Sequence, residues 1–256
     1  MPRDAARLGP EITDKYFRLD IENIRPGLGG SIWVSWGGPV EGTGRIEIWE
    51  PNRHLRLRQE DRQGVVGPVT VDYLLEGSGG RTVLRLVHSG FGAGADWDAE
   101  YDGTRRGWQS FLAVLKHDLE RHRGEPCRAV TFCRPVAMSA EQLWKLMLSP
   151  ACLLAEGSLA GLAAGERYRV RTALGENLDG VIRRLDPPGY LMATVESLHD
   201  ALLCLYCETH GGQGFLTLSW NLYGPAVDAA AELRDRWGAL LDAQLGTVAA
   251  RTEAGC

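Results

Sequence analysis

One histidine lies where its side chain could take part in chemistry. His88 closes the predicted strand in "RTVLRLVHSGF", and strand alternation places it on the same face as Leu84 and Leu86. An imidazole there could act as a general base or as a polar anchor for a ligand. The alternative is a histidine bonded to the backbone at a strand end. Because the sequence places no nucleophile or paired acid beside it, no catalytic residue is assigned, and a non-enzymatic role is preferred.

Other patterns with chemical potential have ordinary structural interpretations. Cys204 and Cys207 form a CxxC, but residues three apart in a strand point to opposite faces, and no second ligand pair follows. The acidic residues of "ADWDAEYDG" precede a predicted helix, where carboxylates favour the positive N-terminal end. Neither GxGxxG nor GxxxxGK[ST] occurs between a strand and a helix. We therefore expect no metal and no cofactor.

Aromatic residues are the remaining candidates for a binding site. The chain has 8 Trp, and such side chains either fill the core or line a pocket. Both interpretations stay open for Trp36 and Trp108. The predicted ligand-binding residues, taken from inward strand faces and helix stripes, are Trp36, Tyr73, His88, Trp108, Phe111, Tyr168, Trp220 and Trp237.

The elements that would position these residues occur twice in the same order. A hairpin around Pro51 and a hairpin around "EGSGG" precede a helix at 105–120. A hairpin around Pro187-Pro188 and one around "THGGQG" precede a helix at 234–249. Apolar residues recur on one face of each helix, with Trp108, Phe111, Leu112, Leu115 and Leu119 on the first, so each helix is expected to pack on a sheet.

This order predicts two tandem domains, residues 1–124 and 125–256. Gly124 and Pro126 end the first helix, and a strand is predicted from Cys127. A short helix capped by Ser139 follows that strand. The first domain shows no counterpart of this strand and short helix. Either that domain is incomplete, or a partner, such as a second copy in a homodimer, supplies the missing strand at the exposed sheet edge.

Four segments resemble one protein family in order and spacing. They are "RPGLGGSIWVSWG", "GTGRIEIWEPNRHLRL", "GGRTVLRLVHSGF" and "WDAEYDGTRRGWQSFLAVLKHDLE". About residues 10–122 are similar to the activator-of-heat-shock-protein-ATPase-homologue branch of the START-like (SRPBCC) superfamily, and residues 127–250 resemble the same fold more weakly. The resemblance implies an α+β helix-grip fold, a curved antiparallel sheet around a long C-terminal helix, with a cavity that takes hydrophobic small molecules.

Composition excludes several classes of function. The net charge is −5 and neither half is basic, which argues against nucleic-acid binding. No apolar run could span a membrane, and no signal peptide is recognised, so a cytoplasmic protein with reduced cysteines is expected. The leading hypothesis is a tandem protein that binds a hydrophobic or aromatic small molecule. The alternatives are a co-chaperone-like interaction module and a cyclase- or hydrolase-type enzyme that uses a cavity histidine.

Overall fold

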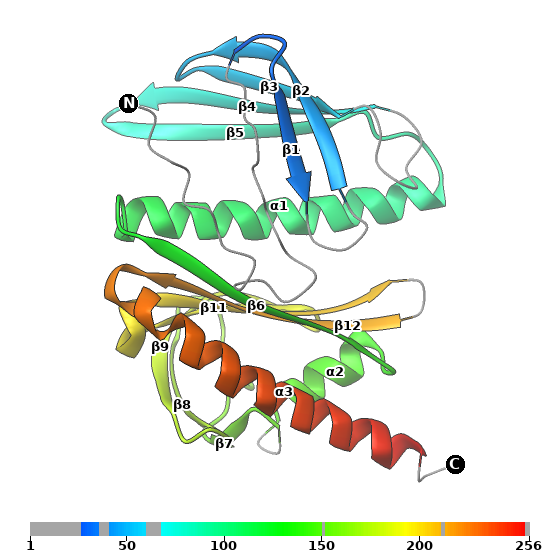
Figure 1. Ribbon diagram of the computed structural model, residues 1–256, viewed down its shortest axis with the longest axis vertical. Helices are drawn as coiled ribbons and strands as arrows, with labels where there is room; N and C mark the ends of the chain where they lie inside the picture. Colours follow the sequence, from blue (N-terminus) through cyan, green and yellow to red (C-terminus); the bar gives the residue numbers. More distant parts are fainter. Residues whose placement is uncertain (1–26, 36–40, 60–67, 150–151, 211–212, 254–256) are drawn as a thin grey trace. The chain divides into compact units, whose positions relative to one another are not determined.

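The computed structural model describes residues 27–35, 41–59, 68–149, 152–210 and 213–253 (Figure 1). By its internal contacts the chain divides into two compact units, and the division falls between Leu115 and Lys116. The first unit holds the N-terminal strands and most of the first helix. The second holds the end of that helix and the rest of the chain.

The first unit is an antiparallel meander followed by a helix. Its strands pair in sequence order. They are β1 (Ser31–Ser35), β2 (Glu41–Glu50), β3 (His54–Gln59), β4 (Val69–Ser78) and β5 (Arg81–Ser89), and α1 (Ala95–Arg121) follows them. The hairpin turns fall at Pro51 and at Gly79-Gly80, as the sequence predicts. Both glycines have positive φ, which few other residues adopt without strain.

A buried carboxylate joins two strands of this meander. Asp72 on β4 is 5% exposed and lies opposite Arg56 on β3. The Arg56 Nε donates to Asp72 Oδ1 over 2.7 Å, and His54 Nε2 lies 2.6 Å from the same oxygen. Desolvation raises the pKa of Asp72, but the hydrogen bonds from Arg56 and His54 outweigh it and leave that pKa below its ordinary value.

The second unit is a seven-stranded antiparallel sheet with two helices. The sheet order is β6-β12-β11-β10-β9-β8-β7. Its strands are β6 (Cys127–Val136), β7 (Leu154–Glu156), β8 (Arg167–Thr172), β9 (Asn177–Asp186), β10 (Tyr190–Val195), β11 (Ala201–His210) and β12 (Gln213–Tyr223). The helices are α2 (Ala140–Met147) and α3 (Ala230–Glu253), and two short 3-10 turns, η1 (Glu196–Leu198) and η2 (Gly224–Ala229), complete the unit.

The strongly curled sheet of the second unit wraps around its C-terminal helix. Figure 1 shows β7, β8 and β9 turning away from β11 and β12 along one side of α3. The core lies between them, with Trp237 of α3 only 1% exposed. Ser139 is the N-cap of α2, as predicted from the sequence, and Gln142 completes a capping box with it. The α+β helix-grip class is thereby confirmed.

The first unit has, within its described residues, no counterpart of β6 and α2. Residues 1–26 lie outside the described part, so the predicted absence of an N-terminal strand and helix stays a prediction. The predicted packing of the whole α1 stripe on the sheet is wrong. Phe111, Leu115 and Leu119 are 49%, 41% and 54% exposed.

Candidate functional site

Three of the predicted ligand-binding residues meet in the first unit. The indole N–H of Trp108, on α1, donates to Nδ1 of His88, at the end of β5, over 3.0 Å. The ring of Tyr73, on β4, meets the Trp108 ring edge-on at a centroid distance of 6.0 Å. Because an indole N–H can only donate, His88 Nδ1 carries no proton, and the imidazole is neutral with its proton on Nε2. The contacts join the helix to two neighbouring strands.

The strand register explains why these side chains converge. Tyr73 pairs with Leu86, and Val71 pairs with His88, so all four lie on one face of the β4–β5 pair. The predicted face is confirmed, since Arg85 on the opposite face is exposed. Burial raises the pKa of Tyr73 to about 12, so its phenol stays neutral and can donate or accept a hydrogen bond.

Further rings extend this cluster beyond the end of β5. Phe91 contacts His88 at 4.9 Å, Tyr101 at 5.4 Å and Trp97 at 6.1 Å between ring centroids. A Cβ at Gly92 would lie 2.4 Å from the Trp97 indole nitrogen, so this position needs glycine. We define the aromatic group as Tyr73, His88, Phe91, Trp97, Tyr101, Trp108 and Phe111. It combines large apolar surfaces with the polar atoms of His88 and Tyr73.

Two predicted residues of the first domain stand apart from this convergence. Phe111 contacts the Trp108 ring at 6.3 Å but is 49% exposed, so it lies at the edge of the aromatic group. Trp36 lies outside the described residues. The prediction that it lines a pocket therefore stays a prediction.

The second unit encloses a cavity between its sheet and its helices. The volume is about 40 Å³, and the lining is almost entirely apolar, with Met147, Leu159, Tyr168, Leu218 and Trp237 among its residues. Pockets that hold drug-sized ligands have roughly 300–1,000 Å³. The helix grip of this unit is therefore filled by its own side chains, and the cavity has room for only one or two water molecules.

The three predicted residues of the second unit are core residues. Tyr168 lines the cavity and donates its hydroxyl to the carbonyl of Thr194 over 2.7 Å. Trp237 lines it too, and its indole N–H donates to Glu176 over 3.1 Å. Trp220 packs edge-on against Trp237 with 5.1 Å between ring centroids and is fully buried. Their positions fit a core that stabilises the fold better than an open binding site.

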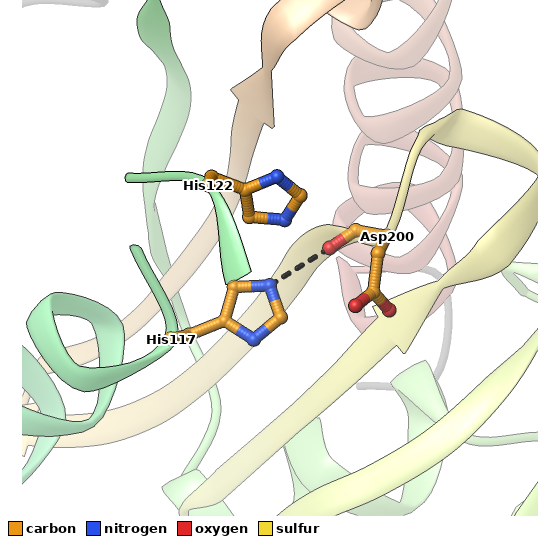
Figure 2. A group of neighbouring side chains, drawn as sticks. All are labelled: His117, His122 and Asp200. Atoms are coloured by element: carbon orange, nitrogen blue, oxygen red, sulfur yellow. Dashed lines mark hydrogen bonds between the residues drawn. The ribbon is translucent and has the colours of Figure 1, made fainter. Parts of the chain in front are cut away.

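A cluster of histidines at the end of α1 was not predicted from the sequence. His117 lies in the last turns of α1, His122 directly follows that helix, and Asp200 directly precedes β11 (Figure 2). One side-chain nitrogen or oxygen of each of the three residues lies within 4.8 Å of the others. Glu125 and His199 adjoin them, with His199 Nε2 2.9 Å from Glu125 Oε2. We call these five residues the histidine group, and all belong to the second unit.

The fold makes close room for the histidine group. A Cβ on Gly224, where φ is +51°, would lie 2.6 Å from Glu125 Oε2 and 3.0 Å from His199 Nε2. Burial lowers the pKa of His117 below its ordinary value, against the opposing effect of its hydrogen bond to Asp200. The sequence signal was weak because His122 and Asp200 are distant along the chain and form no spacing motif.

A comparison with known proteins finds one family model that matches the first part of the chain. The second unit is a helix-grip fold of the α+β class. Residues 5–120 match the model of the family described as "Activator of Hsp90 ATPase homolog 1-like protein". This first part of the chain, less than half of its length, is therefore similar to that family, in agreement with the resemblance seen in the sequence. The matched residues end before the second unit's sheet begins.

Three similar solved structures illustrate the range of the matches. A protein from Mesorhizobium loti is 17% identical with a TM-score of 0.41, and the match covers 49% of this chain and 98% of that one. The Aha1 dimer from Colwellia psychrerythraea is 18% identical with a TM-score of 0.39, over 46% of this chain and 96% of that one. The di-domain aromatase/cyclase of the steffimycin biosynthetic pathway is 13% identical with a TM-score of 0.38, over 92% and 88%. Likenesses of this size do not identify a function.

No curated protein matches the chain. Among the described residues, none of the helices has both the length and the apolar character needed to cross a membrane.

Proposed function

We propose that the first unit binds a hydrophobic or aromatic small molecule at the aromatic group. The observation that carries this proposal is the hydrogen bond between Trp108 and His88, together with the edge-on contact of Tyr73 with the Trp108 ring. These contacts fix the rings in place before a ligand arrives. Fixed rings lose little conformational entropy on binding, which leaves more of the contact energy for affinity.

The expected ligand has a planar apolar body and at least one polar group. Its body would stack on or against the indole of Trp108, since aromatic pairs favour offset-stacked or edge-on geometries. Its polar group would meet the phenol of Tyr73 or the imidazole of His88. In this proposal the second unit stabilises the chain, because its own cavity of about 40 Å³ is far too small for such a ligand.

A dye titration tests this proposal. Anilinonaphthalene sulfonate has a planar apolar body and one charged group, and its fluorescence rises in apolar surroundings. We expect saturable binding at one site in the wild type. Trp108→Ala should weaken it by at least about tenfold, equivalent to about 1.4 kcal/mol. Trp108→Phe should fall between the two, because it keeps a ring but loses the donor to His88.

The control is Trp49→Ala, which removes a tryptophan from β2 that is 39% exposed and lies outside the aromatic group. It should bind the dye as the wild type does. Near-UV circular dichroism would verify that each variant keeps fixed tertiary packing, because the dye also binds loosened states. Equal affinity of Trp108→Ala and Trp49→Ala would reject the proposed site.

A protein-interaction module is the second candidate, in keeping with the family's description. The observation that favours it is the exposure of Phe111 and Leu115, neighbouring apolar residues on α1. The two functions separate by mutation. Leu115→Glu, at an exposed residue outside the aromatic group, would weaken association with a partner or a second copy and leave dye binding unchanged, whereas Trp108→Ala would chiefly abolish dye binding. Sedimentation velocity and the dye titration on both variants distinguish them.

A further inference from the structure

We propose that His117, His122 and Asp200 form a binding site for a divalent transition-metal ion of the zinc class. Two imidazoles and one carboxylate offer ligand atoms within 4.8 Å of one another (Figure 2). Nitrogen ligands of this kind suit zinc, copper, iron and nickel, whereas calcium and magnesium prefer oxygen ligands alone. The site is independent of the small-molecule function proposed for the first unit.

His122 provides the strongest evidence for the site. It is only 3% exposed, and its Nε2 is buried without a hydrogen-bond partner. Its Nδ1 lies 3.2 Å from Glu125 Oε2. Metal-ligating histidines usually donate their second ring N–H to a carboxylate, which fixes the tautomer and leaves the other nitrogen basic. With its Nδ1 proton on Glu125, His122 presents a lone pair at Nε2 that a metal ion would satisfy.

His117 and Asp200 complete the set from two different elements. His117 is 7% exposed, and its Nε2 lies 2.9 Å from the backbone carbonyl of Asp200. An ion bound at His117 Nε2 would require the ring proton to lie on Nδ1, and it would replace the hydrogen bond to the Asp200 carbonyl. The Arg121 guanidinium pairs with Asp200 Oδ2, and a carboxylate can hold a guanidinium with one oxygen and a metal ion with the other.

The backbone around Asp200 is strained in a way that positions its side chain. His199 and Asp200 both adopt left-handed conformations, with φ of 53° and 56°. Non-glycine residues adopt this backbone conformation at a cost in energy and keep it only where the surroundings hold them. The strained pair lies directly between η1 and β11. It brings Asp200 toward the end of α1, where both histidines lie.

Tyr223 holds the rings in place. Its ring stacks on His122 with 4.2 Å between centroids and planes 1° apart, and it lies 5.6 Å from the ring of His117. Tyr223 is fully buried, at the end of β12. Both imidazoles are therefore oriented before any ion binds, and the ligand positions need little reorganisation.

The electrostatic surroundings favour a cation with an open coordination position. A solvent-open depression of about 540 Å³ is lined by Glu120, Arg121, His122, Glu196, His199 and Asp200. Among these six described residues, three carboxylates face one guanidinium. Catalytic zinc sites have three protein ligands and leave the fourth position to water. The depression gives water access to the fourth position of an ion held by His122 and Asp200.

A second arrangement around His122 is less suited to hold the ion. Glu125 Oε2 lies near both His122 Nδ1 and His199 Nε2, and these three residues could also meet around a cation. That choice would use His122 Nδ1 and leave its buried Nε2 carrying an unsatisfied proton. In the proposed site Glu125 instead orients His122, and His199 supports Glu125.

Binding of zinc and cobalt ions to the full chain tests the site. The protein is stripped with a chelator, and competition with a chromophoric zinc indicator gives affinity and stoichiometry. We expect one tightly bound Zn²⁺ and the intense visible absorption of a low-coordinate Co²⁺ complex with nitrogen ligands. His117→Gln and Asp200→Asn should each weaken Zn²⁺ binding by at least about 100-fold, and Glu125→Gln by about 10- to 100-fold.

His199→Gln is the matched control, since it removes a neighbouring histidine that the proposal leaves outside the ligand set. It should keep Zn²⁺ affinity within about tenfold of the wild type. Circular dichroism would verify that each variant folds. If His117→Gln misfolds, the Zn²⁺ affinity of Asp200→Asn alone tests the ligand set. The proposal is overturned by wild-type protein that binds no Zn²⁺, by unchanged affinity in His117→Gln and Asp200→Asn, or by loss of binding in His199→Gln alone.

Discussion

Removing Trp237 should convert the nearly filled core of the second unit into a ligand-sized cavity. Its indole is 1% exposed and forms part of the wall of the existing cavity of about 40 Å³. Trp→Ala substitutions in cores cost about 3–5 kcal/mol, because the lost transfer free energy adds to that of the void. The existing cavity already shows that the surroundings do not collapse fully, so we expect Trp237→Ala to lower the free energy of unfolding by about 4 kcal/mol.

Rescue by an added guest makes this prediction specific. The void left by the indole, joined to the existing cavity, should reach roughly the 150 Å³ at which an apolar cavity holds a benzene-sized guest. Indole should bind best, because its N–H can meet the carboxylate that Trp237 leaves, Glu176 Oε2. A guest that binds only the folded state raises stability by mass action, by about 2.7 kcal/mol at 100 times its Kd.

Differential scanning calorimetry of the full chain, with and without indole, measures both effects. The transition of the second unit should fall by about 8–16 °C in Trp237→Ala and recover in part with indole. The control Trp49→Ala, at a partly exposed site in β2, should shift the thermal transition of the first unit by no more than a few degrees. A loss below about 1 kcal/mol, or an absence of any response to indole, would refute the core packing described for this helix grip.

Three further predictions concern single interactions. Asp72→Asn should lower the free energy of unfolding by about 1–3 kcal/mol at neutral pH. The folded pKa of Asp72 lies below its ordinary value, so its contribution to stability is present above pH 3.8 and is lost as pH falls through the folded pKa. In urea titrations at a series of acidic pH values, the free energy of unfolding should therefore fall less steeply with decreasing pH in the variant than in the wild type. The same steepness in both proteins would contradict this. Ser139→Ala should lower the free energy of unfolding by about 1 kcal/mol, because it removes the N-cap of α2. Ser158→Ala is the exposed control, and equal urea midpoints of unfolding for the two variants would argue against the cap. Burial raises the pKa of the Cys204 and Cys207 thiols to about 12, so both should resist iodoacetamide in the native state at pH 8. Peptide mass mapping that finds either cysteine modified before unfolding would disprove their burial.

The order of strands and helices could be predicted from the sequence because it depends mainly on local features, such as turn residues and the alternation of apolar residues. Pro51, Pro187-Pro188 and the glycine turns cannot lie inside paired strands, so they marked the hairpins in advance. Alternation assigned His88 to the face of Leu84 and Leu86, and the register bears this out. The CxxC was rightly taken for a strand, since β11 contains Cys204 and Cys207 as buried residues.

The predictions that were wrong or missing concern tertiary packing, which the periodicity of a local segment does not encode. The apolar stripe on α1 has the spacing of a packing face. Trp108 reaches the strands, whereas Phe111 and Leu115 stay exposed. The acidic residues expected before the helix lie within its first turns, because α1 begins at Ala95. The histidine group escaped notice because its members come together only when β11 returns beside the end of α1.

The most direct test of ligand binding at the aromatic group is an NMR spectrum of protein with ¹⁵N-labelled tryptophan, recorded while anilinonaphthalene sulfonate is added. Trp108→Phe and Trp237→Phe assign the two indole N–H signals of interest. We expect the Trp108 signal to move until the dye saturates its site, while the Trp237 signal stays in place. Movement of the Trp237 signal with an unchanged Trp108 signal would place the ligand in the second unit and contradict the account.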